Sequence, residues 1–156
     1  MDSTIQLDEV SWQILGELQD NARITFSELG RRVGLSPPAV AERVRGLEEA
    51  GVIVGYRAEV NLEKVGLPLL AFIRIATGER GCGPFGNVVN EFPEVLECHR
   101  ITGGDSYIVK VAVSTVQHLE DLLNRLTPYG QTVTSLALSS PVRNRRVEST
   151  RRPRTG

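Results

Sequence analysis

The stretch LSPPAVAERVRGLEEAGVI, residues 35–53, predicts a helix whose beginning and end are both marked in the sequence. Ser36 can cap the helix, because a serine oxygen accepts a hydrogen bond from a backbone N–H of the first turn that otherwise lacks a partner. Pro37 and Pro38 suit the same turn, where the helix needs no backbone N–H and the fixed φ of proline is helical. Gly51 ends the helix, so the element is short and has a rigid start.

The two sides of this helix differ in character. Val40, Val44 and Leu47 recur at i, i+4 and i+7 and form one apolar stripe. The outward face and its flank are small in the first turn and then carry Arg43 and Arg45. Such a surface is typical of an ordinary solvated helix, and it also suits a close-fitting partner with negative charge.

The neighbouring segments complete a helix-turn-helix. The stretch TFSELGRRVGL, residues 25–35, predicts a short helix in which Thr25 and Glu28 have the spacing of a capping box and Gly34 forms the tight turn. The stretch LDEVSWQILGELQDNAR, residues 7–23, has apolar residues at helical spacing and predicts the third helix. The segment GVIVGYRAEVNLEKVG, residues 51–66, predicts two short strands, or a wing, that lead into a linker.

Residues 7–66 resemble the N-terminal domain of the Lrp/AsnC family, the feast/famine transcription regulators. The resemblance rests on LDEVSWQIL, on LQDNARITFSELGRRVGLSPPAVAERVRGLEEAGVI and on GYRAEVNLEKVG, which follow each other in the family's order and spacing. In that family the last helix of the unit enters the DNA major groove, so the resemblance implies the same for residues 36–50. The residues expected to contact double-stranded DNA are Arg31, Arg32, Ser36, Pro37, Pro38, Ala39, Glu42, Arg43 and Arg45.

Three positions depart from the family pattern. Ser11 stands where the family commonly has aspartate, Gly30 where it usually has alanine, and Gly46 where a basic residue is frequent. The glycine at position 46 removes a possible DNA contact and bears on the affinity more than on the function.

Charge is distributed unevenly along the chain. The formal net charge is −1, which argues against a sequence-independent DNA coat. Residues 23–45 nevertheless carry five arginines against two glutamates, and the chain from Pro141 onward carries six arginines against Glu148 alone. These basic stretches can meet phosphates while the acidic remainder limits nonspecific binding. We expect residues 143–156, which have little apolar content, to be a disordered basic tail.

The compartment follows from what the sequence lacks. It contains no apolar run of membrane-spanning length and no signal peptide, so we expect a cytoplasmic protein without a membrane partner. Cys82 and Cys98 have no metal-ligand spacing, and we expect both to be reduced thiols, with a bridge between them as the less favoured alternative.

The second half of the chain has the order β-α-β-β-α-β. Strands are predicted in residues 67–77, 95–102, 107–114 and 132–142. Helices are predicted in residues 85–95, with a stop near Pro93, and in residues 115–130. This order is typical of the ferredoxin-like plan, in which four antiparallel strands carry both helices on one face. The open face also has apolar alternate positions, which predicts a dimer, and a helix-turn-helix dimer reads a two-fold related DNA site.

The resemblance extends to this half, which looks like the family's effector-binding domain. That domain dimerises through its sheet and often builds higher oligomers, so the resemblance implies a homodimer that can assemble further, up to an octamer. The predicted class is therefore α+β: a winged helix-turn-helix followed by a ferredoxin-like domain for effector binding and oligomerisation. The expected boundaries are 1–54 for the DNA-binding domain, 55–66 for the linker, 67–142 for the ferredoxin-like domain and 143–156 for the tail.

The loop RITGGDSYIVKV, residues 100–111, has the chemistry that an amino acid needs. Backbone N–H groups at Gly103 and Gly104 can hold a carboxylate, Asp105 can hold an ammonium group, and Tyr107 can pack on a side chain. Taken alone, GGD is more typical of an ordinary hairpin turn.

In the family the matching loop, often T-G-D-x-D-Y, binds the amino-acid effector between subunits. Thr102, Gly103 and Tyr107 match that form, whereas Gly104 and Ser106 replace its usual acids, with Asp105 offset between them. The resemblance also points to a hydroxyl-rich segment near the same site, although these residues would serve equally as surface positions of a strand. The expected effector-binding residues are Thr102, Gly103, Gly104, Asp105, Ser106, Tyr107, Thr132, Thr134 and Ser135.

No motif for catalysis or for metal or cofactor binding accompanies these features. GxSxG, P-loop and HExxH patterns are absent, and His99 and His118 lack partners at ligand spacing. We therefore expect no enzyme, no cofactor and no metal, but a bacterial or archaeal transcription regulator that binds specific DNA and senses an amino acid or related metabolite. One alternative is an architectural DNA-binding protein without an effector. The other is an enzyme built on the ferredoxin-like half, for which no nucleophile–base pair can be named.

Overall fold

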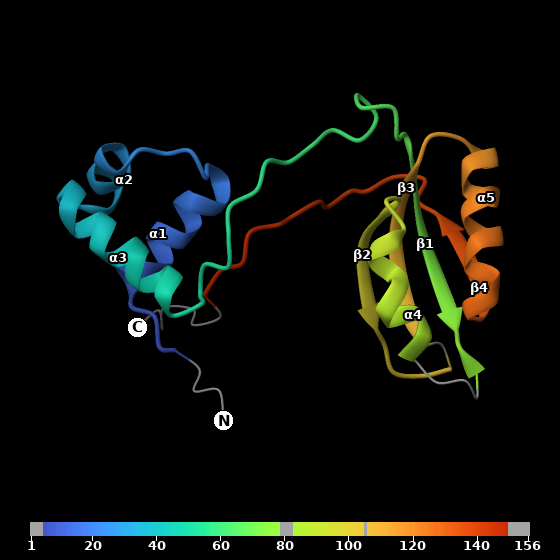
Figure 1. The fold of residues 1–156 in the computed structure, drawn as a ribbon. Coiled ribbons are helices and arrows are strands. Elements are labelled where there is room, and N and C mark those ends of the chain that lie inside the picture. Colours follow the sequence, from blue (N-terminus) through green and yellow to red (C-terminus); the bar gives the residue numbers. More distant parts are fainter. Residues whose placement is uncertain (1–4, 79–82, 105, 150–156) are drawn as a thin grey trace, which may run out of the picture. The chain divides into compact units, whose positions relative to one another are not determined.

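The computed structural model describes residues 5–78, 83–104 and 106–149, and the chain divides into two compact units. The helical unit comprises residues 1–58 together with residues 142–156, and the sheet unit comprises residues 59–141. Figure 1 shows their elements along the chain.

The described part of the helical unit contains three helices. They are α1 (Glu9–Asp20), α2 (Phe26–Val33) and α3 (Pro37–Glu49). Each begins at a capping side chain: Asp8 accepts from the N–H of Ser11, Thr25 from that of Glu28, and Ser36 from that of Ala39. The Ser36 cap and the two prolines thus start α3 where predicted.

The three helices bury a small apolar core. Its fully or nearly fully buried side chains are Ile14, Leu18, Leu29, Val40, Val44 and Leu47. The turn between α2 and α3 is tight, because Gly34 adopts the left-handed φ of 72° and the N–H of Leu35 bonds back to the carbonyl of Gly30. A Cβ on Gly30 would overlap the Leu35 carbonyl oxygen, so this turn depends on the glycine that departs from the family pattern.

The predicted wing does not form in the described chain. Residues 54–60 contain no strand, and the Val54 side chain is 94% exposed. A strand exists only where a second strand satisfies its backbone N–H and C=O groups, and no other described segment pairs with this one. The apolar–polar alternation that predicted strands here therefore lies in an extended, unpaired segment.

The described part of the sheet unit contains four antiparallel strands, as predicted, and they lie in the order β2-β3-β1-β4. The strands are β1 (Leu69–Ala76), β2 (Val95–Arg100), β3 (Tyr107–Val113) and β4 (Gln131–Leu136). The helices are α4 (Gly83–Val88) and α5 (Val116–Leu126), and single 3-10 turns follow them at η2 (Val89–Glu91) and η3 (Thr127–Tyr129). The first helix begins at Gly83, tightens to a 3-10 turn at Val89 and ends at Glu91, close to the predicted stop near Pro93.

One face of the sheet packs against α4 and α5. Ile73, Val109 and Val111 from the central strands are fully buried there with Phe85 and Leu122 from the two helices. Gly130, with φ of 155°, lets the chain enter β4 so closely that a Cβ would overlap the Ala76 carbonyl oxygen.

The opposite face carries no helix and mixes apolar and charged side chains. Strand alternation places Phe72 and Val133 on it, and they are 37% and 50% exposed. Lys110 and Glu97 form an ion pair on the same face, with 2.7 Å between Nζ and Oε1. The face is therefore partly apolar, as the strand pattern predicted.

The C-terminal arm, residues 142–149, belongs to the helical unit. The Gln19 side chain of α1 pairs with the backbone of Val147, and Arg146 pairs with Asp20. Arg146 and Val147 thus have defined contacts with α1, in contrast to the expected disorder of the tail, because Gln19 satisfies both backbone polar groups of Val147. Residues 150–156 lie outside the described chain. Among the described residues, no helix combines the length and apolar composition that crossing a membrane requires.

Candidate functional site

The outward face of α3 is small and open in its first turn. Pro37, Pro38 and Glu42 are exposed there, and Ala39 is half-buried. Arg45 follows on the same face, and its guanidinium binds both carboxylate oxygens of Glu42 at 2.7 Å. Because the Arg45 pair is exposed to water, a phosphate can replace the glutamate at little cost.

Arg43 occupies a different position from Arg45. Its Nη1 donates to Oδ2 of Asp8 at 2.7 Å and to Oγ of Ser11 at 3.3 Å, which joins α3 to the first turn of α1. Hydrogen bonds from Ser11 and Arg43 lower the pKa of Asp8 to about 2. Ser11, where the family commonly has aspartate, is nearly buried beneath this contact. Arg43 therefore positions α3 and has a competing partner for any phosphate.

Arg31 and Arg32 on α2 are also paired within the unit. Both donate to Glu28, and Nη1 of Arg32 also reaches Oε2 of Glu17 at 2.6 Å. Hydrogen bonds from Arg31 and Arg32 lower the pKa of Glu28 to about 2. All four arginines predicted to meet DNA thus have an acidic partner in the same unit.

The predicted effector loop joins β2 to β3. Thr102, Gly103 and Gly104 are exposed, and Gly103 has the left-handed φ of 114°, which favours glycine. Asp105, the predicted ammonium partner, lies outside the described residues. The loop therefore presents an open backbone at its tip.

The other two loop residues hold the loop in place. Oγ of Ser106 lies 2.8 Å from Oγ1 of Thr77, and the Ser106 N–H donates to the Ile75 carbonyl. Tyr107 is buried on the helix-covered face, and its ring meets that of Phe85 edge-on at 5.3 Å. Tyr107 is thus part of the core of the sheet unit, and Ser106 ties the loop to the end of β1 at the edge of that core.

The hydroxyl-rich segment of β4 is divided between the two faces of the sheet. Thr132 and Thr134 lie on the helix-covered face, and Thr132 shares the rung of Ile75 with Tyr107. Ser135 pairs with Phe72 on the open face. The structure therefore brings Thr132 to the same end of the sheet as the loop and places Ser135 apart from it.

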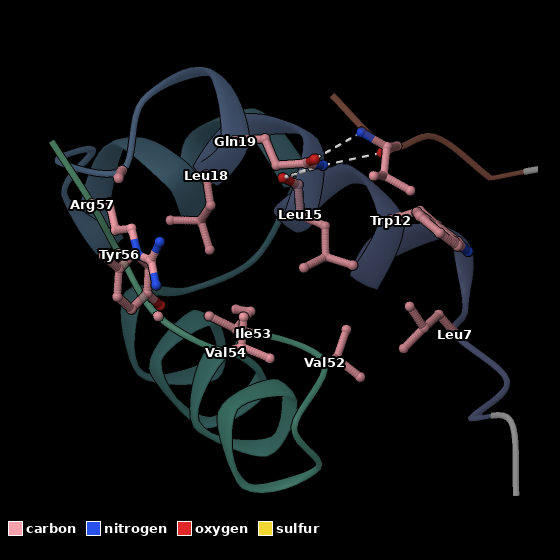
Figure 2. A pocket seen from close by; sticks show the side chains of 13 residues that line it. Leu7, Trp12, Leu15, Leu18, Gln19, Val52, Ile53, Val54, Tyr56 and Arg57 are labelled. Atoms are coloured by element: carbon pink, nitrogen blue, oxygen red, sulfur yellow. Dashed lines mark hydrogen bonds between the residues drawn. The ribbon is translucent and has the colours of Figure 1, made fainter. Parts of the chain in front are cut away.

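Sequence reasoning missed an apolar groove of about 430 Å³ on the helical unit. Figure 2 shows it between α1 and residues 52–57, with Trp12 and Leu15 on one wall and Val52 and Ile53 on the other. Gln19 lies at its edge with its hydrogen bonds drawn. The wall residues occur at ordinary core spacing, so no sequence signal separates a groove from a core here.

A buried carboxylate forms the only other polar cluster of note in the described part of the sheet unit. Glu94 accepts from Arg125, and its Oε1 lies 3.1 Å from Nε2 of His118. Ser114 lies against the other ring nitrogen of His118. The described residues contain no group of three metal-ligating side chains, and Cys98 is a free thiol whose pKa is raised by burial. Cys82 lies outside the described residues.

Comparison with known proteins matches both units. Residues 7–48 match the model of the AsnC-type helix-turn-helix domain, and residues 70–147 match that of the Lrp/AsnC ligand binding domain. The HTH-type transcriptional regulator LrpC of Bacillus subtilis is 36% identical over 135 residues, which cover 86% of this chain and 94% of that protein.

Solved structures give the same result. The structure of LrpC from B. subtilis has a TM-score of 0.83 at 35% identity and covers 87% of this chain and 97% of its own. A feast or famine regulatory protein from M. tuberculosis, complexed with L-methionine, has a TM-score of 0.86 at 34% identity and covers 92% of this chain and 100% of its own.

Proposed function

The chain belongs to the Lrp/AsnC family of transcriptional regulators, and on that premise we propose that it binds specific double-stranded DNA under the control of an amino acid or related metabolite. The observation that carries the proposal is α3 itself: a capped helix with a small, exposed first turn followed by the exposed Arg45. A protein that acts on the genome of a bacterium or archaeon works in the cytoplasm.

The DNA contact is proposed for α3 and the end of α2. A helix in the major groove must approach the base edges closely. The residues of α3 proposed to face the bases are Ser36, Pro37, Pro38, Ala39 and Glu42. Arg45 exchanges Glu42 for a base or a phosphate. Arg31, Arg32 and Arg43 contact phosphates by exchanging their own carboxylate partners, and these contacts fix the position of the helix.

The test is selection of duplexes from a random-sequence pool by the full chain, followed by titration of the selected duplex. Replacing both Arg43 and Arg45 by alanine should weaken binding, each base-reading arginine being worth about 1–3 kcal/mol. Arg100→Ala is the matched control, because it removes one exposed arginine from the sheet unit. Equal affinity of the double variant and the control would refute the assignment to α3. Equal binding of every duplex by the full chain would favour the architectural alternative.

The effector site is proposed for the 102–107 loop with the β4 hydroxyls. Three observations support it: the exposed backbone of Gly103 and Gly104, the position of Thr132 at the same end of the sheet, and the L-methionine bound by a related protein. The glycine N–H groups would bind the carboxylate of the ligand, and Asp105 its ammonium group. Thr102 and Ser106 lie in the loop on either side of the two glycines and Asp105. Ser135 lies on the open face of the sheet and would contact the ligand only from that face.

Calorimetry with the twenty amino acids tests this site. Asp105→Ala should abolish binding, and Asp121→Ala, which removes an exposed acid from α5, should leave it unchanged. Binding that survives Asp105→Ala would remove the ammonium role from that residue. Coupling to DNA binding should be modest, about 1–3 kcal/mol.

The partner of the open sheet face is proposed to be a second copy of the chain. Phe72 and Val133 offer the apolar surface, and a homodimer, assembling further to an octamer, would present two copies of α3 to a two-fold site. Phe72→Arg should shift the sedimentation coefficient toward that of a monomer, and an unchanged coefficient would place the interface elsewhere.

A further inference from the structure

The helical unit without its C-terminal segment has a net negative charge, which opposes the approach of DNA. Residues 1–58 contain six arginines, no lysine and nine acidic residues, a formal charge of −3. Residues 59–141 also have a formal charge of −3, from six basic and nine acidic residues. Residues 142–156 contain six arginines and one glutamate, a formal charge of +5, and they raise the charge of the helical unit to +2.

The distribution of ion pairs leads to the same segment. The arginines of α2 and α3 are all neutralised by acids of their own unit. Among the described residues of the helical unit, the arginines without an ion pair are Arg23, Arg57, Arg143 and Arg145. Two of these four arginines, Arg143 and Arg145, therefore lie on the C-terminal arm. A phosphate that binds either of them displaces no carboxylate of the described chain.

Side chains of α1 hold this arm. Nε2 of Gln19 donates to the Val147 carbonyl at 3.0 Å, and Oε1 of Gln19 accepts from the Val147 N–H at 2.8 Å, so one amide satisfies both polar groups of one residue. Arg146 binds Asp20 at 3.2 Å and Glu148 at 2.9 Å. Val147 borders the apolar groove at the same place. Arg146 thus serves as an anchor, which separates its role from that of Arg143 and Arg145.

We propose that the arm is a second DNA-contacting element, docked on α1 through Gln19, whose Arg143 and Arg145 bind the phosphate backbone of the duplex. The proposal rests on the proposed DNA-binding function of α3 and assigns a different task to the arm. Contacts to phosphates carry no sequence information, so the arm adds affinity to every duplex alike. Docking matters because an arm already ordered on α1 does not lose its conformational freedom when DNA binds.

Charge and docking are tested by separate variants. Arg143→Ala with Arg145→Ala removes two phosphate contacts and should lower the slope of log affinity against log salt by about two. Gln19→Ala keeps every arginine, so the slope should stay at the wild-type value while affinity falls about fivefold or more, the cost of ordering about one residue. Gln13→Ala is the matched control, because Gln13 is exposed on the same helix and bonds to no other described residue.

The measurements are fluorescence anisotropy titrations over a salt series with the full chain. Two labelled duplexes serve as probes: one selected by the wild type from a random pool, and a scrambled version of it. Both should lose affinity equally in each arm variant. The Arg43 and Arg45 double variant should lose affinity for both duplexes through the phosphate contact of Arg43, and also the preference between them through the base contact of Arg45. Amide exchange without DNA should show the Val147 N–H losing protection in Gln19→Ala and keeping it in Gln13→Ala.

The possible failures differ from one another. An unchanged salt slope in the Arg143 and Arg145 double variant, with normal wild-type binding, refutes the contact by the arm and leaves the function of α3 intact. Equal affinity and equal Val147 protection in Gln19→Ala and Gln13→Ala refute the docking. A wild type that binds neither duplex refutes the DNA-binding function, and with it the role of the arm.

Discussion

Among the residues that the structure describes, the core of the helical unit has six buried apolar side chains and that of the sheet unit has twelve. The helical unit compensates with local devices: three capped helices and a surface on which Glu28 and Asp8 each bind arginine. Exposed ion pairs contribute little and are weakened by salt, whereas buried apolar area does not depend on salt or pH in this way. The unit proposed to read DNA is therefore also the one whose stability is more sensitive to salt and pH.

The largest expected effect on the stability of either unit comes from truncating one buried leucine in each core. Leu29 and Leu122 are both fully buried, and replacing either by alanine costs about 2–5 kcal/mol. We expect Leu29→Ala to unfold the helical unit and leave the sheet unit folded, because a six-residue core has less stability to lose. Leu122→Ala should weaken the sheet unit and leave the helical unit unchanged.

The chain provides a clean probe for this experiment. Trp12 is its single tryptophan and lies on α1, so fluorescence during urea unfolding follows the helical unit alone. Amide exchange of β3 follows the sheet unit. Equal shifts of both signals in both variants would show that the units unfold as one and would remove the comparison.

Replacing either of two glycines of the helical unit by alanine should change its free energy of unfolding by an intermediate amount, with opposite signs at the two positions. Gly30→Ala should destabilise the Trp12 transition by about 1–3 kcal/mol, because the new Cβ overlaps the Leu35 carbonyl oxygen. Gly46→Ala should stabilise the same transition by about 0.5–1 kcal/mol, since the position is a helix interior with open space around it. Stabilisation by both substitutions would mean that the turn between α2 and α3 is looser than the structure has it.

The smallest expected effect is that of low pH on the thermal stability of the helical unit. The pKa values of Asp8 and Glu28 fall from their usual 3.8 and 4.5 to about 2 in the folded unit. A depressed folded pKa stabilises at pH above the unfolded value, and the contribution is lost as pH falls from about 4.5 toward 2. The midpoint of thermal unfolding followed by Trp12 should therefore decline over that range, and less steeply in Glu28→Gln. An equal decline in the variant would show that Glu28 gains nothing from Arg31 and Arg32.

Much of the fold could be predicted because its signals are local. Ser36, Pro37 and Gly51 mark the ends of α3 within a few residues of sequence, and the alternation of buried residues gives the strands. The predicted wing failed because residues 54–60 have the residue pattern of a strand without a partner, and a pattern cannot supply one. The predicted helix of residues 85–95 likewise contains a change to a 3-10 turn at Val89.

The site was less predictable because its decisive contacts are distant in sequence. Periodicity placed Arg43 on the flank of α3, but its partner Asp8 lies 35 residues away. Gln19 and Val147 are separated by 128 residues, and neither belongs to a motif. The family resemblance supplied the candidate residues, whereas the division of the β4 hydroxyls between two faces follows from the register with β1.

The return of the C-terminal arm to α1 has a consequence for synthesis on the ribosome. Residues 1–58 emerge before the sheet unit and can pack the three helices described here at once, but the segment that brings the helical unit to a positive charge is translated only after the sheet unit. At ordinary translation speeds the intervening residues take on the order of ten seconds. Until residues 142–156 have been made, the helical unit therefore has a formal charge of −3, which opposes the approach of any polyanion. Once they have been made, its formal charge is +2.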